Sequence, residues 1–467
     1  MTINFKIGSF PLTCLSFSIV KIQSGDGKMP VQFGKRASTA CVGGVVLLLA
    51  SSIFLGGADG PMATSMCVLG LLLLAAVAAW LNLSVPMETL FLGGLLGVAA
   101  LSGLAGNWDM ARTEWLQLCG AVAIWTAGRT LGTERYLVKL SWYALMGTLM
   151  AIGLLAILAY GLDVSGGLGV SRMKFTFGSP NSFAALMAVG AILSVGHISY
   201  KLTQHTSQEI SLVSRFGQLP GKTILSMSAL VVCGGCVMLS LSRAGFVLMV
   251  LACLFVALVS ILSAPDFRRY WKRLIVGHPF ASAAGLLAAC FMVALLLGAE
   301  TQFGARASDL HVDAMDRWAA FGEYWSVWQQ KPLIGHGLGS FNHVNERLTN
   351  LENAPYLVTL GAAHNVGLQW LIQTGLVGTA LMAAIWLAMH FQIIRALRKR
   401  AEGANFGFIV AVLAVSVYFS IHSMIDFPLE LPGIMWIYSF VLGLACGVAA
   451  SEIRKSEAER VQTQNQT

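Results

Sequence analysis

Residues 223–263 read TILSMSALVVCGGCVMLSLSRAGFVLMVLACLFVALVSILS and contain a single charged residue, Arg243. Arg243 separates two apolar runs of about 20 residues, the length that a helix needs to cross a hydrocarbon layer of ~30 Å. The stretch therefore predicts two transmembrane helices, near 223–241 and 244–263, joined by a very tight turn.

Apolar runs of this kind recur along the whole chain. The sequence has 467 residues, of which 56% are apolar and only 11% are charged, whereas soluble domains average about 25% charged residues. This composition excludes a water-soluble globular protein and predicts an all-α, polytopic membrane protein. We expect about twelve transmembrane helices, near residues 39–57, 62–81, 87–105, 113–129, 140–160, 182–200, 223–241, 244–263, 280–299, 364–391, 407–423 and 432–450.

The predicted helices divide the chain into five segments. These are a cytoplasmic N-terminal segment (1–38), nine transmembrane helices (39–299), a loop domain on the opposite side (300–363), three further transmembrane helices (364–450) and a cytoplasmic tail (451–467). The first segment contains no convincing span, and either Met1 or Met29 is the expected start.

The distribution of positive charge predicts the orientation. If both termini are cytoplasmic, 22 of the 30 Lys and Arg residues lie on the cytoplasmic side, as the positive-inside rule requires. These residues account for the net charge of +8 without any nucleic-acid partner. The eight basic residues on the far side are candidates for function, because topology alone disfavours them there. They are Arg112, Arg172, Lys174, Arg243, Arg306, Arg317, Lys331 and Arg347.

The connection over residues 300–363 is much longer than the others, and long ordered loops are usually functional. It contains apolar residues at helical spacing, which predict one apolar stripe on an amphipathic helix at the membrane surface. The stripe residues are Met315, Trp318, Phe321, Trp325 and Trp328. Arg317 flanks the stripe, where a guanidinium can bind phosphate oxygens in bidentate fashion.

Three further cations gather on the same outer face. Arg172 and Lys174 precede Ser179-Pro180-Asn181, where Ser179 fits an N-cap and Pro180 the first helical position. A helix start beside two cations is suited to anions, and Arg243 lies at the outer edge of its tight turn. We expect Arg172, Lys174, Asn181, Arg243 and Asn365 to bind the pyrophosphate of a lipid-borne sugar donor.

Transfer of the sugar also needs a base that takes a proton from the attacking hydroxyl. His364 begins the tenth predicted span at the outer face, and a histidine titrates near pH 7. Asp426 follows His422 by four residues near the outer end of the next span, so it is a second candidate base or a group that orients an imidazole. We therefore expect His364, Arg317 and Asp426 to be the catalytic residues.

Two other patterns leave alternatives open. Asp309, His311, Asp313 and Asp316 lie close in sequence and would suit a metal ion, but the predicted helix start favours acidic residues in any case, so we expect no metal and no cofactor. The glycines of the segment 332–339, PLIGHGLG, permit close backbone approach, and a phosphate-binding loop is one reading of them.

The ordered set of motifs resembles the superfamily of O-antigen ligases and Wzy-type polysaccharide polymerases, which are bacterial polytopic membrane glycosyltransferases. The resemblance rests on SRMKFTFGSPNSFAA (171–185), the Ser242-Arg243 turn, DRWAAFGEYW (316–325), KPLIGHGLGSF (331–341) and HNVGLQWLIQTGLVG (364–378).

The resemblance implies a GT-C-like fold in the bacterial inner membrane and a metal-independent, inverting glycosyltransferase. The donor would be glycan on undecaprenyl pyrophosphate, and transfer would occur at the periplasmic face, to lipid A–core in a ligase or to another lipid-linked repeat in a polymerase. It also implies that Arg172, Arg243 and Arg317 match the family's arginines and His364 its histidine. A protein O-oligosaccharyltransferase of the same superfamily remains open. So does a secondary transporter with twelve helices, although no internal repeat is evident.

Overall fold

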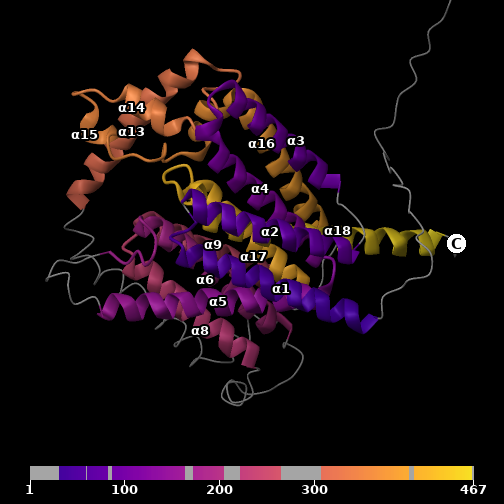
Figure 1. Ribbon diagram of the computed structural model, residues 1–467. Helices are drawn as coiled ribbons and strands as arrows, with labels where there is room; N and C mark the ends of the chain where they lie inside the picture. Colours follow the sequence, from indigo (N-terminus) through magenta and orange to yellow (C-terminus); the bar gives the residue numbers. More distant parts are fainter. Residues whose placement is uncertain are drawn as a thin grey trace, which may run out of the picture.

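The protein is described by a computed structural model for residues 31–58, 60–82, 87–162, 172–204, 221–263, 307–398 and 404–464. Within these ranges the structure contains helices and no strand. The helices that form the bundle are α1 (Val31–Phe54), α2 (Pro61–Asn82), α3 (Met87–Ala105), α4 (Trp108–Leu131), α5 (Arg135–Leu162), α6 (Pro180–Gln204), α8 (Gly221–Leu239), α9 (Arg243–Leu262), α16 (Val366–Arg398), α17 (Ala404–His422) and α18 (Pro432–Gln464) (Figure 1).

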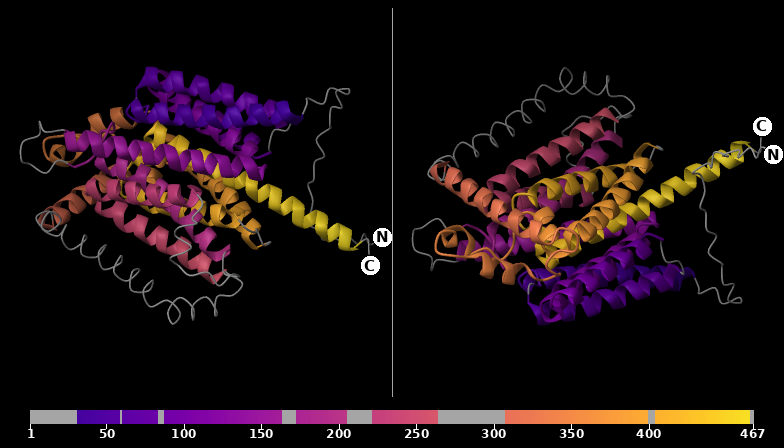
Figure 2. Two further views of the ribbon diagram at one scale, coloured as in Figure 1. Left: turned by 90° about the horizontal axis from the view of Figure 1, so that it is seen from below. Right: turned by 90° about the horizontal axis from the view of Figure 1, so that it is seen from above.

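Every predicted span within the described ranges coincides with a helix, and the predicted span 280–299 lies outside them. In the described part of the chain, nine helices are long and apolar enough to cross a membrane. α3 does not meet this criterion because its apolar part is confined to Phe91–Ala105. α4 does not meet it either. α18 continues as a helix to Gln464 and projects beyond the bundle (Figure 2).

The centre of the bundle is formed by α6, α17 and α18. In the most apolar stretch of α6 and in that of α18, 83% of the residues are buried, compared with 28% in that of α16. α4 packs closely against α18, and a Cβ atom at Gly443 would meet the backbone oxygen of Trp125. Small residues therefore allow these two helices to approach each other closely.

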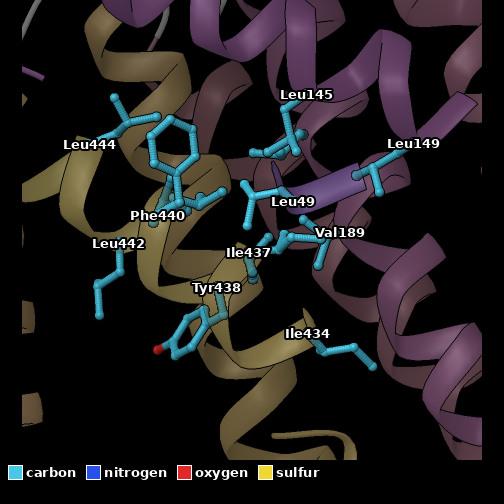
Figure 3. Close-up of a cluster of buried hydrophobic side chains, with 14 of the residues drawn as sticks. Leu49, Leu145, Leu149, Val189, Ile434, Ile437, Tyr438, Phe440, Leu442 and Leu444 are labelled. Carbon is cyan, nitrogen blue, oxygen red and sulfur yellow. The ribbon is translucent and has the colours of Figure 1, made fainter. Parts of the chain in front are cut away.

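α18 has two apolar faces with different surroundings. Ile437 points toward Leu49 and Val189, whereas Tyr438 and Leu442, which belong to the same buried cluster, lie on another side of α18 (Figure 3). That side of the helix also lines a groove, described below.

Three helices cover one end of the bundle, opposite the projecting part of α18 (Figures 1 and 2). They are α13 (Ala307–Gln330), α14 (Phe341–Leu348) and α15 (Ala354–Leu357). The helix predicted in the long connection is thus present. Phe321 and Trp328 pack on a small core formed with α14 and α15, whereas Met315, Trp318 and Trp325 are exposed. The face of α13 that packs on this core also contains Ala320, Tyr324 and Val327.

The glycine-rich segment 332–339 packs on a break in α16. Gly375 has φ +62° and interrupts the helix there. The N–H groups of His336 and Gly337 donate to the carbonyls of Ile372 and Gln373, at 2.7 and 2.9 Å. These N–H groups are used within the protein and are not available to a phosphate. Its glycines serve the close approach instead, since a Cβ atom at Gly335 would lie 2.6 Å from the backbone carbon of Gln373.

Candidate active site

Asp426 is the centre of the polar site at the covered end of the bundle. It lies between α17 and the short 3₁₀ helix η1 (Pro428–Glu430), and it is 2% exposed. Its Oδ1 accepts the Phe427 N–H at 2.9 Å, and its Oδ2 accepts the side-chain amide of Asn181 at 2.5 Å. A buried carboxylate with two donors is held in one orientation.

His364 lies beside this carboxylate. Its Nδ1 is 3.5 Å from Oδ1 of Asp426, and its ring packs edge-on against Phe427 with centroids 4.6 Å apart. His364 has φ +54°, a conformation that L-residues rarely adopt, in the turn directly before α16. Burial lowers the pKa of His364, the Asp426 carboxylate raises it and the charge of Arg317 lowers it, with a net decrease. The imidazole is therefore neutral at pH 7 and can accept a proton.

Arg172 holds the other side of Asn181. Its Nη2 donates to Oδ1 of Asn181 at 2.5 Å, and its Nε donates to the carbonyl of Ser240 at 3.0 Å. The Ser179 hydroxyl accepts the backbone N–H of Asn181, which confirms Ser179 as the N-cap of α6. Hydrogen bonds therefore connect the turn between α8 and α9 to Asp426, through Arg172 and then Asn181 at the start of α6.

Arg317 reaches the same place from α13. Its Nη1 donates to the carbonyl of Ile425, next to Asp426. The helix over the bundle end therefore contributes a cation to a site whose other members come from the start of α6 and from the segments before α6, α16 and α18. We refer to Arg172, Asn181, Arg317, His364 and Asp426 as the Asp426 site.

The other predicted residues occupy different positions. Arg243 is the first residue of α9, in the turn that Arg172 contacts, and Ser242 is the N-cap of this helix. Lys174 is exposed. Asn365 caps α16, since its Oδ1 accepts the Leu368 N–H at 3.0 Å and its Nδ2 donates to the carbonyl of Met424 at 3.2 Å.

An apolar groove of about 480 Å³ opens beside this site. It is lined by α3, α4, α16, the end of α17 and the start of α18, and it extends along α16 from Val366 to Met389, roughly 35 Å at 1.5 Å per residue. Val366 and Met424 lie at the end nearest His364, and Tyr438 and Leu442 line its wall. The groove has the shape and apolar lining that suit a hydrocarbon chain.

The sequence analysis did not assign three ionisable residues close to this region. His422 is fully buried next to the loop of Asp426, and neither ring nitrogen has a hydrogen-bond partner in the described structure. Glu114 and Glu430 both line the groove. The spacing of four residues between His422 and Asp426 is a signal that the sequence contains. No local pattern in the sequence indicates that Glu114 and Glu430 lie close together.

The described residues contain no group of three or more His, Cys, Asp or Glu side chains that could hold a metal ion. The side chains of Asp309, His311 and Asp313, which carried the metal alternative, lie outside the described part of the structure.

Comparison with protein families identifies the central part of the chain. Residues 228–383 match the family model described as O-antigen ligase. These residues, about a third of the chain, form a region similar to an O-antigen ligase domain. This domain contains Arg243, Arg317 and His364, whereas Arg172, Asn181 and Asp426 lie outside its limits. No curated protein matches the sequence.

The domain match confirms the resemblance to the O-antigen ligase superfamily that the motifs predicted. Together with the nine apolar helices of the described residues, it indicates a multi-pass membrane protein. The Asp426 site contains residues from inside the matched region and residues from outside it, and the fold places the two groups side by side.

Proposed function

We propose that the protein transfers or polymerises glycan from an undecaprenyl-pyrophosphate donor at the periplasmic face of the bacterial inner membrane, in the synthesis of a cell-surface polysaccharide. The observation that carries this proposal is a neutral histidine paired with a buried carboxylate and flanked by arginines, next to an apolar groove. A lipid-linked pyrophosphate needs the groove for its chain and the cations for its phosphates.

The reaction follows from the positions of these groups. The Nδ1 edge of His364 faces Asp426, so the opposite nitrogen, Nε2, is the one that takes the proton from the acceptor hydroxyl. The hydroxyl oxygen then forms a bond to the anomeric carbon while the bond from that carbon to the pyrophosphate oxygen breaks. Asp426 stabilises the imidazolium that forms, and in-line displacement inverts the anomeric centre.

The arginines act on the leaving group. Undecaprenyl pyrophosphate departs with an additional negative charge, which fixed guanidinium groups stabilise. Arg317 has its Nη1 on the carbonyl of Ile425, which holds the guanidinium beside His364. Its charge also keeps the imidazole unprotonated before the reaction. The leaving group is a stable anion, so no residue has to protonate it, and in this proposal no metal takes part.

Substitution of the proposed base and cation tests the mechanism. His364→Ala and Arg317→Ala should each lower glycan transfer about 10²- to 10⁴-fold, the usual contribution of a general base or a charge-stabilising donor. The measurement is transfer in membranes together with the abundance of the inserted protein. His343→Ala and Arg347→Ala on α14 are matched controls on the same covering helices. Full activity in both site variants would exclude the proposed site.

Deletion of the gene separates the possible products. A polymerase deletion should accumulate single lipid-linked repeats, and a ligase deletion should accumulate long unattached polymer. Unchanged lipid-linked glycans would favour the alternative of a secondary transporter. Loss of transfer on addition of EDTA, with recovery on addition of a divalent cation, would contradict the metal-independent mechanism.

A further inference from the structure

The apolar groove contains a polar patch that the proposed reaction does not use. Glu114 reaches it from α4, Glu430 from η1 and Ser423 from the segment after α17. We call these three residues the glutamate patch. Most of the remaining groove lining is apolar, so the patch marks one place where a bound molecule meets hydrogen-bonding groups.

Glu114 is fixed by the segment that packs on the break in α16. The side-chain amide of Gln373 donates to its Oε1 at 3.2 Å, and the N–H of Gly339 donates to the same carboxyl group. In the described ranges, no Lys or Arg forms an ion pair with Glu114 or Glu430. The two carboxyl groups are thus placed in an apolar groove without a compensating cation.

Glu430 has no side-chain hydrogen bond to any part of the chain that the structure describes. Burial and the neighbouring charge of Glu114 raise the pKa of Glu430 to about 8. At pH 7 this carboxyl group is therefore mostly protonated, and it offers one O–H donor as well as acceptor oxygens. A neutral acid of this kind suits a partner that both accepts and donates hydrogen bonds.

Ser423 points independently to a ligand at the same place. Its side chain is fully buried, its Oγ has no partner within the described structure, and the residue lines the groove. A buried hydroxyl without a partner is destabilising. A ligand that supplies the missing hydrogen bond would remove this cost on binding.

The chemistry of the patch distinguishes it from the Asp426 site. Phosphate oxygens only accept hydrogen bonds and carry negative charge, so the cations of the Asp426 site suit them and two carboxyl groups do not. Sugar hydroxyls are uncharged and both donate and accept. From these contacts, and resting on the proposed function, we propose that Glu114, Ser423 and Glu430 form a subsite for the uncharged hydroxyl groups of a lipid-linked sugar acceptor.

Two amphiphiles with the same hydrocarbon chain test this subsite directly. The full-length protein, in nanodiscs of phosphatidylcholine, is exposed to an alkyl glucoside or an alkyl phosphate, each with a diazirine in the chain, and cross-links to groove peptides are counted by mass spectrometry. Glu430→Leu should lower capture of the glucoside about tenfold and leave capture of the phosphate unchanged. Glu430→Gln, which keeps a neutral donor and acceptor, should stay within about threefold of the wild type.

The opposite pattern is expected for Arg317→Ala, which should lower capture of the phosphate and leave the glucoside unchanged. Unchanged glucoside capture in both Glu430→Leu and Ser423→Ala would overturn the subsite. An equal loss of both amphiphiles in Glu430→Leu would also overturn it, because the residue would then support only the shape of the groove.

Because this assay needs no turnover, its outcome is separate from that of the proposed reaction. Selective capture of glucoside by a protein that transfers no glycan would keep the subsite and reject the transferase. In an active protein, Glu430→Leu should raise the KM for acceptor about tenfold with little change in the KM for donor. An unchanged KM for acceptor would reject the subsite while His364 and Arg317 kept their roles.

Discussion

The Asp426 site and the glutamate patch are two polar regions next to one apolar groove, and they differ in how their groups are satisfied. In the Asp426 site, Arg172, Asn181 and Asp426 form a continuous chain of hydrogen bonds, and His364 lies beside this chain with its Nδ1 3.5 Å from Asp426 and not hydrogen-bonded. In the glutamate patch, the Ser423 hydroxyl has no hydrogen-bond partner within the described residues, and none is found there for the Glu430 carboxyl. A satisfied network holds charges in fixed positions, as catalysis requires, whereas unsatisfied groups indicate where a ligand binds.

The largest expected effect comes from breaking the satisfied network at its centre. Asp426→Ala leaves the Asn181 amide and the Phe427 N–H without their acceptor in a buried place. We expect the free energy of unfolding to fall by about 2–4 kcal/mol. Transfer should fall about 10²- to 10⁴-fold. Thermal unfolding of the purified protein and glycan transfer in membranes measure the two effects.

Asp426→Asn separates the shape of this side chain from its charge. It should restore most of the stability, because an amide oxygen can still accept a hydrogen bond, but little of the transfer. Equal transfer in Asp426→Asn and the wild type would show that His364 needs no carboxylate beside it.

The second prediction is about a substitution that should displace residues 332–339, the segment that supports Glu114 of the glutamate patch. Gly375 has φ +62°, and a Cβ atom there would meet the backbone of Leu333. Gly375→Ala should therefore displace residues 332–339, including Gly339, which donates to Glu114. We expect a loss of about 2–4 kcal/mol in the free energy of unfolding.

Gly322→Ala on α13 is the matched control for that substitution. A Cβ atom at Gly322 has no neighbour within 4 Å, and the residue is helical. The change should be neutral or stabilise the protein by up to about 1 kcal/mol. Similar losses in the two variants would show that the close approach at Gly375 does not determine stability.

The helices and several of their ends could be predicted from the sequence because their signals are local. Apolar length predicted the spans, and Ser179 and Ser242 are the N-caps of α6 and α9. The grouping of His364, Arg317 and Asp426 followed from counting spans, since residues at the same end of the bundle share one face. The structure brings these three side chains together.

The remaining contacts depend on how distant elements pack, and no local pattern encodes them. Asn181 and Asp426 are 245 residues apart in sequence, and Gln373 and Glu114 are 259 residues apart. The glycines of residues 332–339 suggested phosphate binding, but in the structure they allow this segment to pack on the break in α16. The sequence does not show that these two segments are neighbours.

The third prediction uses pH to sharpen the assignment of His364 to the Asp426 site. Burial and the charge of Arg317 lower its pKa below the usual 6.5. Since only the neutral imidazole accepts a proton, more than half of the maximal transfer should remain at pH 6.5, and half of it should be lost only at lower pH. Arg317→Gln removes a charge that lowers the pKa, so the acid limb of its residual activity should move to higher pH.

A pH profile of residual transfer tests both statements. An acid limb that stays in place in Arg317→Gln would contradict the electrostatic link between the two residues. Loss of half the activity at pH 6.5 or above in the wild type would mean that the titrating group is not a histidine with a lowered pKa.

The smallest expected effect is that of substituting Lys174, which lies at the edge of the group of cations. Lys174 was predicted to bind the donor, but its side chain is exposed, two residues from the anchored Arg172. An exposed cation contributes only a screened attraction, so Lys174→Ala should raise the KM for donor less than about threefold, and the effect should shrink as salt is added. Arg172→Ala should raise it more than about tenfold at every salt concentration, because Asn181 and then Asp426 lose their support. A salt-independent loss of more than tenfold in Lys174→Ala would instead place this lysine on the pyrophosphate and extend the satisfied network beyond Arg172.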